Sequence, residues 1–223
     1  MPLIPHAPRP GWPELATVLI AYLLLILVIA LWLAQIPDGQ AAWRGVAGMA
    51  ANGVAGVVAF LVAFTVRIRD FRAFGFRAVA RPWRLVGAAV GVVAFGLSFL
   101  IEGLYIQFVT EANTQADFQA AATGGMLSLL ALLITGALLT PLGEELVFRG
   151  VIANALNRYG RWAGVAGSAA IFAAVHGPSV IFLNAFMVGL LVGVLFRRTA
   201  SLWPGLVVHA VYNGLWLLYY AKP

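Results

Sequence analysis

The sequence predicts an all-α fold, a polytopic bundle of transmembrane helices, and two observations lead to this class. Of the 223 residues, 62% are hydrophobic and only 10% are charged, a composition far more apolar than that of an average soluble domain. Apolar runs of about 20 residues, the length that a helix needs to cross a bilayer, recur along most of the chain. No linker-like or low-complexity stretch divides them, so residues 1–223 are expected to form a single integral-membrane domain.

About seven spans are expected. We place them at roughly 15–35, 42–66, 85–108, 126–157, 161–176, 179–197 and 202–220. The first run could instead be a signal peptide, but no clear small-x-small cleavage site accompanies it. The fourth run is longer than one span needs and is expected to be composite. Pro141 in this run, or Gly177-Pro178 after the fifth, could tilt or break a helix.

Basic residues near the span ends set the expected orientation. The loop between the second and third spans is the densest in arginine (Arg67, Arg69, Arg72, Arg77, Arg81 and Arg84), so the positive-inside rule predicts that it is cytoplasmic. Alternation of the spans then gives an N-in, C-out topology, with only Arg44 and Lys222 on the outer side. The net charge of +6 therefore reflects membrane topology, and we expect a lipid bilayer but no nucleic acid as a partner.

Two adjacent glutamates lie inside the fourth apolar run. Ionisable groups at such depth are expensive, so each needs a partner or a function. Glu145 and Arg149 are four residues apart, so they meet on one helix face and can form a buried ion pair. Glu144 points about 100° away from Glu145 and has no opposite charge three or four positions away. Its partner must therefore come from another helix.

Histidine and asparagine residues in later spans are the candidate partners. Glu144 and His176 each lie sixteen residues from Gly160, so two antiparallel helices turning there would bring them together about 24 Å from the turn. His209 and Asn213 are four apart and present donors from one helix face. His209 is expected at about 12–15 Å from its own turn, so it meets Glu144 only if the turns differ in height or a helix is tilted. The alternative for His176 is a hydrogen-bonded core residue. The alternative for the pair His209 and Asn213 is a clamp that holds two helices together by hydrogen bonds.

These residue types match the requirements of peptide hydrolysis, which are activation of water and stabilisation of an oxyanion. The sequence contains no H-E-x-x-H motif, no G-x-S-x-G motif and no cysteine. A His₂Glu zinc site formed by Glu144, His176 and His209 remains the alternative. Asn213, one helical turn from His209, is however a poor zinc ligand. In addition, neither histidine has a carboxylate three or four positions away on its own helix that could orient the imidazole ring as a metal ligand. We therefore expect a site without metal or cofactor.

Three other polar residues are less persuasive as catalytic groups. Glu102 is expected near an outer span end, where it can reach water. Asn52 and Asn184 are expected to be packing or hydrogen-bonding residues, with Asn184 a candidate for lining the site.

The motifs Glu-Glu-x-x-x-Arg at 144–149, Phe-x-x-x-His at 172–176 and His-x-x-x-Asn at 209–213 together resemble the CPBP family. This family includes the type II CAAX prenyl endopeptidases and the bacterial Abi proteins, and the resemblance covers about residues 126–216. It implies a glutamate-type intramembrane endopeptidase that acts without a metal ion. Glu144 and His176 would activate water, His209 and Asn213 would hold the oxyanion, and Glu145 and Arg149 would be a supporting pair.

The leading hypothesis is therefore an intramembrane endopeptidase that opens toward the cytoplasmic half of the bilayer and cleaves a membrane-associated peptide or protein. The alternative is a non-catalytic scaffold, assembly or bacteriocin-immunity protein, since some members of the family have such roles. The expected location is a bacterial or archaeal cell membrane. The sequence indicates neither a particular substrate nor an oligomeric state.

Overall fold

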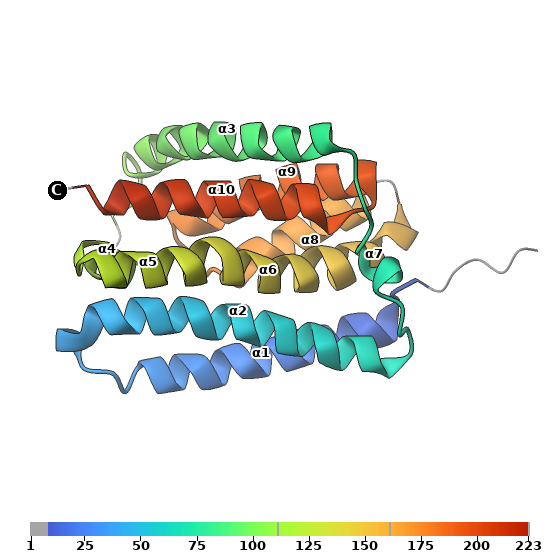
Figure 1. Ribbon diagram of the computed structural model, residues 1–223, viewed down its shortest axis with the longest axis horizontal. Coiled ribbons are helices and arrows are strands. Elements are labelled where there is room, and N and C mark those ends of the chain that lie inside the picture. Colours follow the sequence, from blue (N-terminus) through green and yellow to red (C-terminus); the bar gives the residue numbers. More distant parts are fainter. Residues whose placement is uncertain (1–8, 111, 161, 223) are drawn as a thin grey trace, which may run out of the picture.

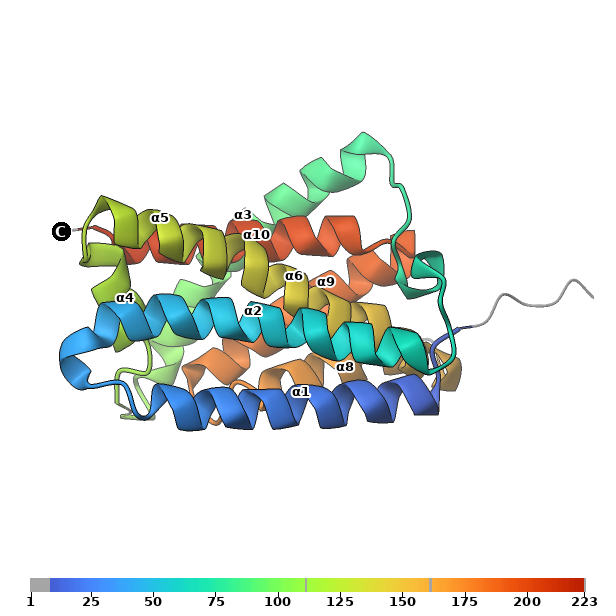
Figure 2. The same ribbon diagram turned by 60° about the horizontal axis from the view of Figure 1, so that its bottom comes forward.

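The computed structural model describes residues 9–110, 112–160 and 162–222, and Figures 1 and 2 show a bundle of helices running along one axis. Within these residues every long element is a helix, which confirms the all-α polytopic prediction. The helices are α1 Trp12–Leu33, α2 Ala41–Val66, α3 Arg81–Tyr105, α4 Ala116–Thr123, α5 Met126–Ile134, α6 Thr140–Glu145, α7 Asn154–Leu156, α8 Ala163–Ala174, α9 Val180–Thr199 and α10 Leu202–Tyr220.

Within the described residues, five helical segments are long and apolar enough to cross a membrane: Trp12–Leu33, Asp38–Val66, Arg81–Tyr105, Met126–Tyr159 and Val180–Thr199. The remaining two expected spans are less regular. Helix α8 is apolar but has only 12 residues, too few to cross a bilayer alone. Helix α10 has 19 residues and carries His209 and Asn213 in its middle. The count of seven spans therefore stays a prediction.

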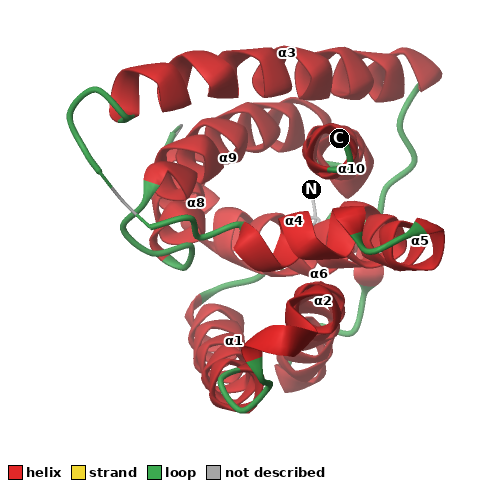
Figure 3. Cartoon of the chain, turned by 90° about the vertical axis from the view of Figure 1, so that its left-hand side faces the viewer, coloured by secondary structure: helices red, strands yellow, loops and turns green. Residues whose placement is uncertain are grey.

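Three groups of helices make up the bundle. Viewed along the helices, the α1–α2 pair lies on one side and α3 on the opposite side, with α4 to α6 and α8 to α10 between them (Figure 3). Helix α2 packs on α6, and α10 packs on α3 and α9. An aromatic series joins the groups, since the ring centroids of Tyr22 and Phe148 are 5.7 Å apart and those of Phe148 and Phe172 are 4.9 Å apart. The candidate catalytic residues are thus held between firmly packed helices.

Charged side chains are divided between the two ends of the bundle. The end formed by the start of α1, the loop between α2 and α3, and the end of α9 carries most of the arginines (Figure 1). At the other end, Arg44 is paired with Asp38 at 3.1 Å and with Asp117 at 2.6 Å. The described chain ends also lie at opposite ends of the bundle (Figure 1). This arrangement agrees with the alternation of the spans, and the cytoplasmic location of the arginine-rich end remains the prediction of the positive-inside rule.

Pro141 does not break its helix. Residues 126–159 form one continuous helical segment, which is π-helical over Thr135–Leu139 and Leu146–Ala153, on either side of α6. Proline lacks an N–H and clashes with a carbonyl of the preceding turn in a regular α-helix. Here Pro141 is the second residue of α6, and the residues of the preceding turn belong to the π-helical stretch that ends at Leu139. Short π-helical stretches often occur at functional sites.

Glycine residues allow α2 and α6 to cross at very short distance. A Cβ atom added at Gly56 would lie 2.5 Å from the carbonyl carbon of Gly143, and one added at Gly53 would lie 2.7 Å from the carbonyl carbon of Leu139. Real Cβ atoms do not approach backbone so closely, so neither position accepts a larger residue without movement of a helix. This close crossing brings Asn52 on α2 within reach of Glu144 on α6.

We expect Gly56→Ala to destabilise the protein by about 1–3 kcal/mol, because the added methyl group must push α2 away from α6. The measurement is thermal unfolding in detergent. Gly96→Ala on α3 is the matched control, since its Cβ would meet nothing within 4 Å; alanine there should be neutral or should stabilise the helix by about 0.5–1 kcal/mol. Equal melting temperatures for the two variants would show that the crossing is not as close as described.

Candidate active site

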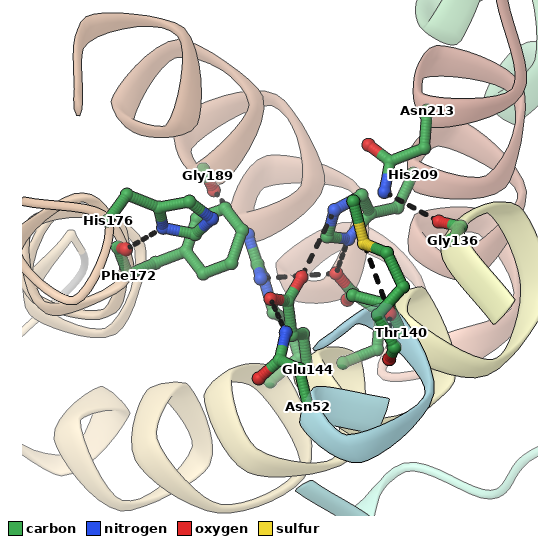
Figure 4. Close-up of polar contacts among 12 residues, drawn as sticks. Asn52, Gly136, Thr140, Glu144, Phe172, His176, Gly189, His209 and Asn213 are labelled. Atoms are coloured by element: carbon green, nitrogen blue, oxygen red, sulfur yellow. Dashed lines mark hydrogen bonds and ion pairs between the residues drawn. The ribbon is translucent and has the colours of Figure 1, made fainter. Parts of the chain in front are cut away.

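All four candidate catalytic residues line one cavity of about 240 Å³. Glu144 comes from the end of α6, and His209 and Asn213 come from the middle of α10. His176 lies in the turn after α8. Figure 4 shows how these side chains converge from helices that are distant in the sequence.

Glu145 and Arg149 form the expected ion pair on one helix face. Arg149 Nη1 lies 3.1 Å from Glu145 Oε1, and the two side chains are 0% and 1% exposed. Arg149 Nη2 donates a hydrogen bond to the carbonyl of Gly189 at 3.2 Å, and the guanidinium carbon lies 4.9 Å from the centre of the Phe172 ring. The arginine therefore links the glutamate helix to α9 and α8, in addition to neutralising Glu145.

Glu144 is held by partners from two other helices. Its Oε2 lies 3.3 Å from His209 Nε2, and its Oε1 accepts a hydrogen bond from Asn52 Nδ2 at 2.9 Å. Asn52 in turn accepts one from the hydroxyl of Tyr22 at 2.7 Å. Although it lines the cavity, Glu144 is only 3% exposed, so its carboxylate is both fixed in position and largely shielded from bulk water.

His209 lies between the two carboxylates. Its Nε2 faces Glu144 at 3.3 Å and its Nδ1 faces Glu145 Oε1 at 3.2 Å. The imidazole ring is thereby held between the two carboxylates, and it connects Glu144 with the buried Glu145–Arg149 pair.

His176 does not occupy the expected place beside Glu144. Its Nδ1 lies 2.7 Å from the carbonyl oxygen of Phe172, and because a carbonyl only accepts, Nδ1 is the donor. In the neutral ring the lone pair is then on Nε2. Phe172 separates the two histidines, with ring centroids 4.7 Å from His176 and 5.6 Å from His209, and His176 lies apart from the Glu144 carboxylate (Figure 4).

Glu144 and His176 line the same cavity, but Glu144 contacts His209 and Asn52 directly. The spacing argument that paired Glu144 with His176 assumed two regular α-helices, whereas Leu146–Ala153 is π-helical and α8 ends at Ala174. Beyond α8, Gly177 has a φ of +75°, and the proline after it disfavours helical backbone. His176 therefore reaches the cavity from a turn and not from a helix.

Asn213 has a backbone partner in this structure. Its Nδ2 donates to the carbonyl oxygen of Gly136 at 2.9 Å, within the first π-helical stretch. His209 faces the two carboxylates, so in this structure the two polar side chains on this face of α10 have different partners. An amide group has a second N–H, so Asn213 keeps a donor for a ligand in the cavity.

Two residues of the site carried little signal in the sequence. Asn52 was expected only to pack or to form hydrogen bonds, and Tyr22 was not singled out, yet together they hold Glu144 Oε1. The only available sign was that each is a polar side chain within an apolar run. Asn184 lines the cavity as expected and donates to Glu102 Oε1 at 3.1 Å.

A zinc site is not assembled by the side chains of the described residues. Residues 9–110, 112–160 and 162–222 contain no group of three histidine or acidic side chains placed to hold a metal ion. Of the alternative zinc ligands, His209 faces Glu144 and Glu145, whereas His176 faces the Phe172 carbonyl. The donor set Glu144, His176 and His209 therefore does not fit a metal in this arrangement.

The cavity extends toward the end of the bundle opposite the arginines. Its lining includes Glu102 near the end of α3, Gln115 before α4 and Tyr220 at the end of α10. These segments lie at the end where the C-terminal residues are found (Figure 1). The positive-inside rule predicts that the arginine-rich end is cytoplasmic, and under that prediction the cavity would extend toward the outer half of the bilayer. The orientation of the bundle and the expected opening toward the cytoplasmic half both stay predictions.

A known protein family matches the part of the chain that contains the three motifs. Residues 126–215 match the family model described as Type II CAAX prenyl endopeptidase Rce1-like. This part of the chain is Rce1-like, and the resemblance to the CPBP family is confirmed. No curated protein and no solved structure matches the chain.

The Rce1-like segment contains all four candidate catalytic residues and the Glu145–Arg149 pair. The family model that this segment matches describes prenyl endopeptidases of the type II CAAX class. Helices α1 to α3 lie outside the matched residues, although α1 and α2 contribute Tyr22 and Asn52 to the hydrogen bonds around Glu144.

Proposed function

We propose that the protein is an intramembrane endopeptidase in which Glu144 activates a water molecule. The observation that carries this proposal is the Glu144 carboxylate, buried at the cavity wall of an Rce1-like segment and held by Asn52 and His209. A general base must be fixed within reach of the proton that it removes. Both partners of Glu144 fix the carboxylate in this way, at the wall of a cavity of about 240 Å³.

In the proposed reaction, Glu144 takes a proton from water as the water oxygen bonds to the peptide carbonyl carbon. The resulting oxyanion is stabilised by the second N–H of Asn213 and by His209 when its Nε2 carries a proton. The C–N bond then breaks, and the proton passes from Glu144 to the leaving nitrogen. His176 contributes from the opposite wall, where the lone pair of its Nε2 accepts a hydrogen bond from the attacking water. Glu145 and Arg149 hold the His209 ring in position.

The test compares wild-type protein with Glu144→Ala, both purified and shown to be folded. Each is incubated with a library of membrane proteins and peptides, and new chain ends are identified by mass spectrometry. The proposal expects peptide bonds that are cut only by the wild type. Identical product profiles, or no products from a folded wild type over a broad range of conditions, would instead favour a non-catalytic scaffold or immunity protein.

We expect Asn213→Ala to lower kcat by about 10²–10³-fold, the effect of removing one donor to an oxyanion. Asn184→Ala is the matched control, because Asn184 lines the same cavity but donates to Glu102; its kcat should fall by less than about 10-fold. Steady-state rates on a cleaved substrate give both values. Thermal melting checks that loss of the Gly136 contact leaves Asn213→Ala folded, and equal losses in the two variants would remove Asn213 from the mechanism.

We also propose that the reaction needs no metal ion, since Glu144, His176 and His209 are not placed as a common ligand set. Activity should survive prolonged treatment with a chelator, and elemental analysis of active protein should show well under about one zinc per chain, the stoichiometry of a catalytic site. Loss of stoichiometric zinc together with activity, and recovery of both on zinc addition, would reverse this assignment and make the two histidines ligands.

A further inference from the structure

A second cavity, of about 250 Å³, lies at the arginine-rich end of the bundle. Five arginines from four parts of the chain line it: Arg9, Arg72, Arg77, Arg158 and Arg197. Asn154 and Asn157 also line the cavity. We call this cavity the arginine pocket. None of its residues belongs to the cavity that contains Glu144.

The positive charge of the arginine pocket is not neutralised by the chain. Within the described residues, no acidic side chain lines the pocket, and none of its five arginines is paired with a carboxylate. Nearby Arg67, by contrast, binds Glu14 at 3.0 Å. Five guanidinium groups around one cavity repel each other unless an anion is bound, and the planar arginine fork matches the oxygens of a phosphate group.

Aromatic side chains place the pocket at the membrane surface. Trp12, Tyr159, Trp162 and Trp203 are all exposed at this end of the bundle, as is typical of side chains at the level of lipid headgroups. Two of the pocket arginines lie against this belt: Arg197 is 4.7 Å from the ring centre of Trp162, and Arg158 is 5.9 Å from that of Tyr159. At this depth a phospholipid headgroup is the most abundant source of phosphate.

We propose that the arginine pocket binds the phosphate group of an anionic phospholipid. The cavity holds a group of headgroup size, and the exposed apolar surfaces of the adjoining helices are available to the acyl chains. Basic pockets between transmembrane helices recognise anionic headgroups in this manner. Bound lipid neutralises the cluster and fastens together the start of α1, the loop before α3 and the end of α9. This site is independent of the proposed peptidase activity.

The test compares two double variants that remove the same charge. Arg72→Gln/Arg158→Gln changes the pocket, whereas Arg69→Gln/Arg84→Gln changes exposed arginines at the same end outside it; each lowers the net charge from +6 to +4. Native mass spectrometry measures retention of phosphatidylglycerol against phosphatidylcholine with identical acyl chains. The pocket variant should retain the anionic lipid about 30-fold less well than wild type, which corresponds to about 1 kcal/mol for each arginine. The control should keep most of its preference.

Three results would overturn the proposal. The first is a wild type with no preference for phosphatidylglycerol, and the second is equal loss in the two double variants, which would reduce the effect to diffuse surface charge. The third is a result in which inorganic phosphate raises the melting temperature as much as phosphatidylglycerol does and displaces the bound lipid, which would assign the pocket to a soluble phosphate.

A second pair of substitutions covers the case in which the glutamine variant unfolds. Arg72→Lys/Arg158→Lys keeps the positive charge but not the forked geometry of the guanidinium groups. It should retain phosphatidylglycerol measurably less well than the wild type, with a smaller loss than the glutamine variant.

Discussion

Replacing Glu144 by glutamine is expected to lower kcat by about 10²–10⁴-fold, the contribution of a positioned general base. Glutamine has nearly the same size, and its amide oxygen can still accept the hydrogen bond from Asn52. It cannot take a proton from water, and its NH₂ group can only donate toward His209 Nε2, where a carboxylate now lies at 3.3 Å. The loss should appear mainly in kcat rather than in KM, because the charge on water develops in the transition state.

Glu102→Gln provides the matched control for this experiment. Glu102 lines the same cavity, and its Oε1 accepts a hydrogen bond from Asn184 at 3.1 Å, but it does not contact either histidine of the site. Its replacement should change kcat by less than about 10-fold. We would measure initial rates of both variants in detergent or nanodiscs to obtain kcat, and record melting curves to verify that both are folded. A Glu144→Gln enzyme as active as the control would exclude Glu144 as the base.

Removal of Arg149 is expected to cause the largest loss of stability of any charged side chain in the chain. Arg149→Ala removes the arginine partner of Glu145 from a pair whose side chains are 0% and 1% exposed, and leaves His209 Nδ1, at 3.2 Å, as the neighbour of the carboxylate. It also removes the hydrogen bond to the Gly189 carbonyl. Breaking a buried pair in this way costs about 3–5 kcal/mol. Thermal unfolding in detergent should therefore occur at a clearly lower temperature than for the wild type.

Two comparisons distinguish loss of the ion pair from loss of arginine in general. Arg69→Ala removes an exposed arginine and should change stability by no more than about 0.5 kcal/mol. The double variant Glu145→Gln/Arg149→Met removes both charges and keeps the volume, so it should recover part of the stability lost in Arg149→Ala. Unchanged melting of Arg149→Ala would contradict the buried pair.

The sequence alone was sufficient for features that depend on composition or on spacing within one helix. Apolar runs of membrane length predicted an all-helical membrane protein, because only helices satisfy their own backbone hydrogen bonds along such a run. Glu145 and Arg149 were predicted to pair because residues four apart share a face of any helix, and a buried pair is present at 3.1 Å. The order of the motifs also predicted the family resemblance, since residues 126–215 match the Rce1-like family model.

Only the tertiary structure decided which side chains meet across helices. Glu144 contacts His209 and Asn52, and His176 reaches the same cavity from the turn beyond the end of α8. Tyr22 and Asn52 reach the site because glycines allow α2 to cross α6 at close range. The depth of a residue depends on the winding, length and crossing of whole helices, which are set by packing between segments distant in the sequence and not by the spacing of residues within one.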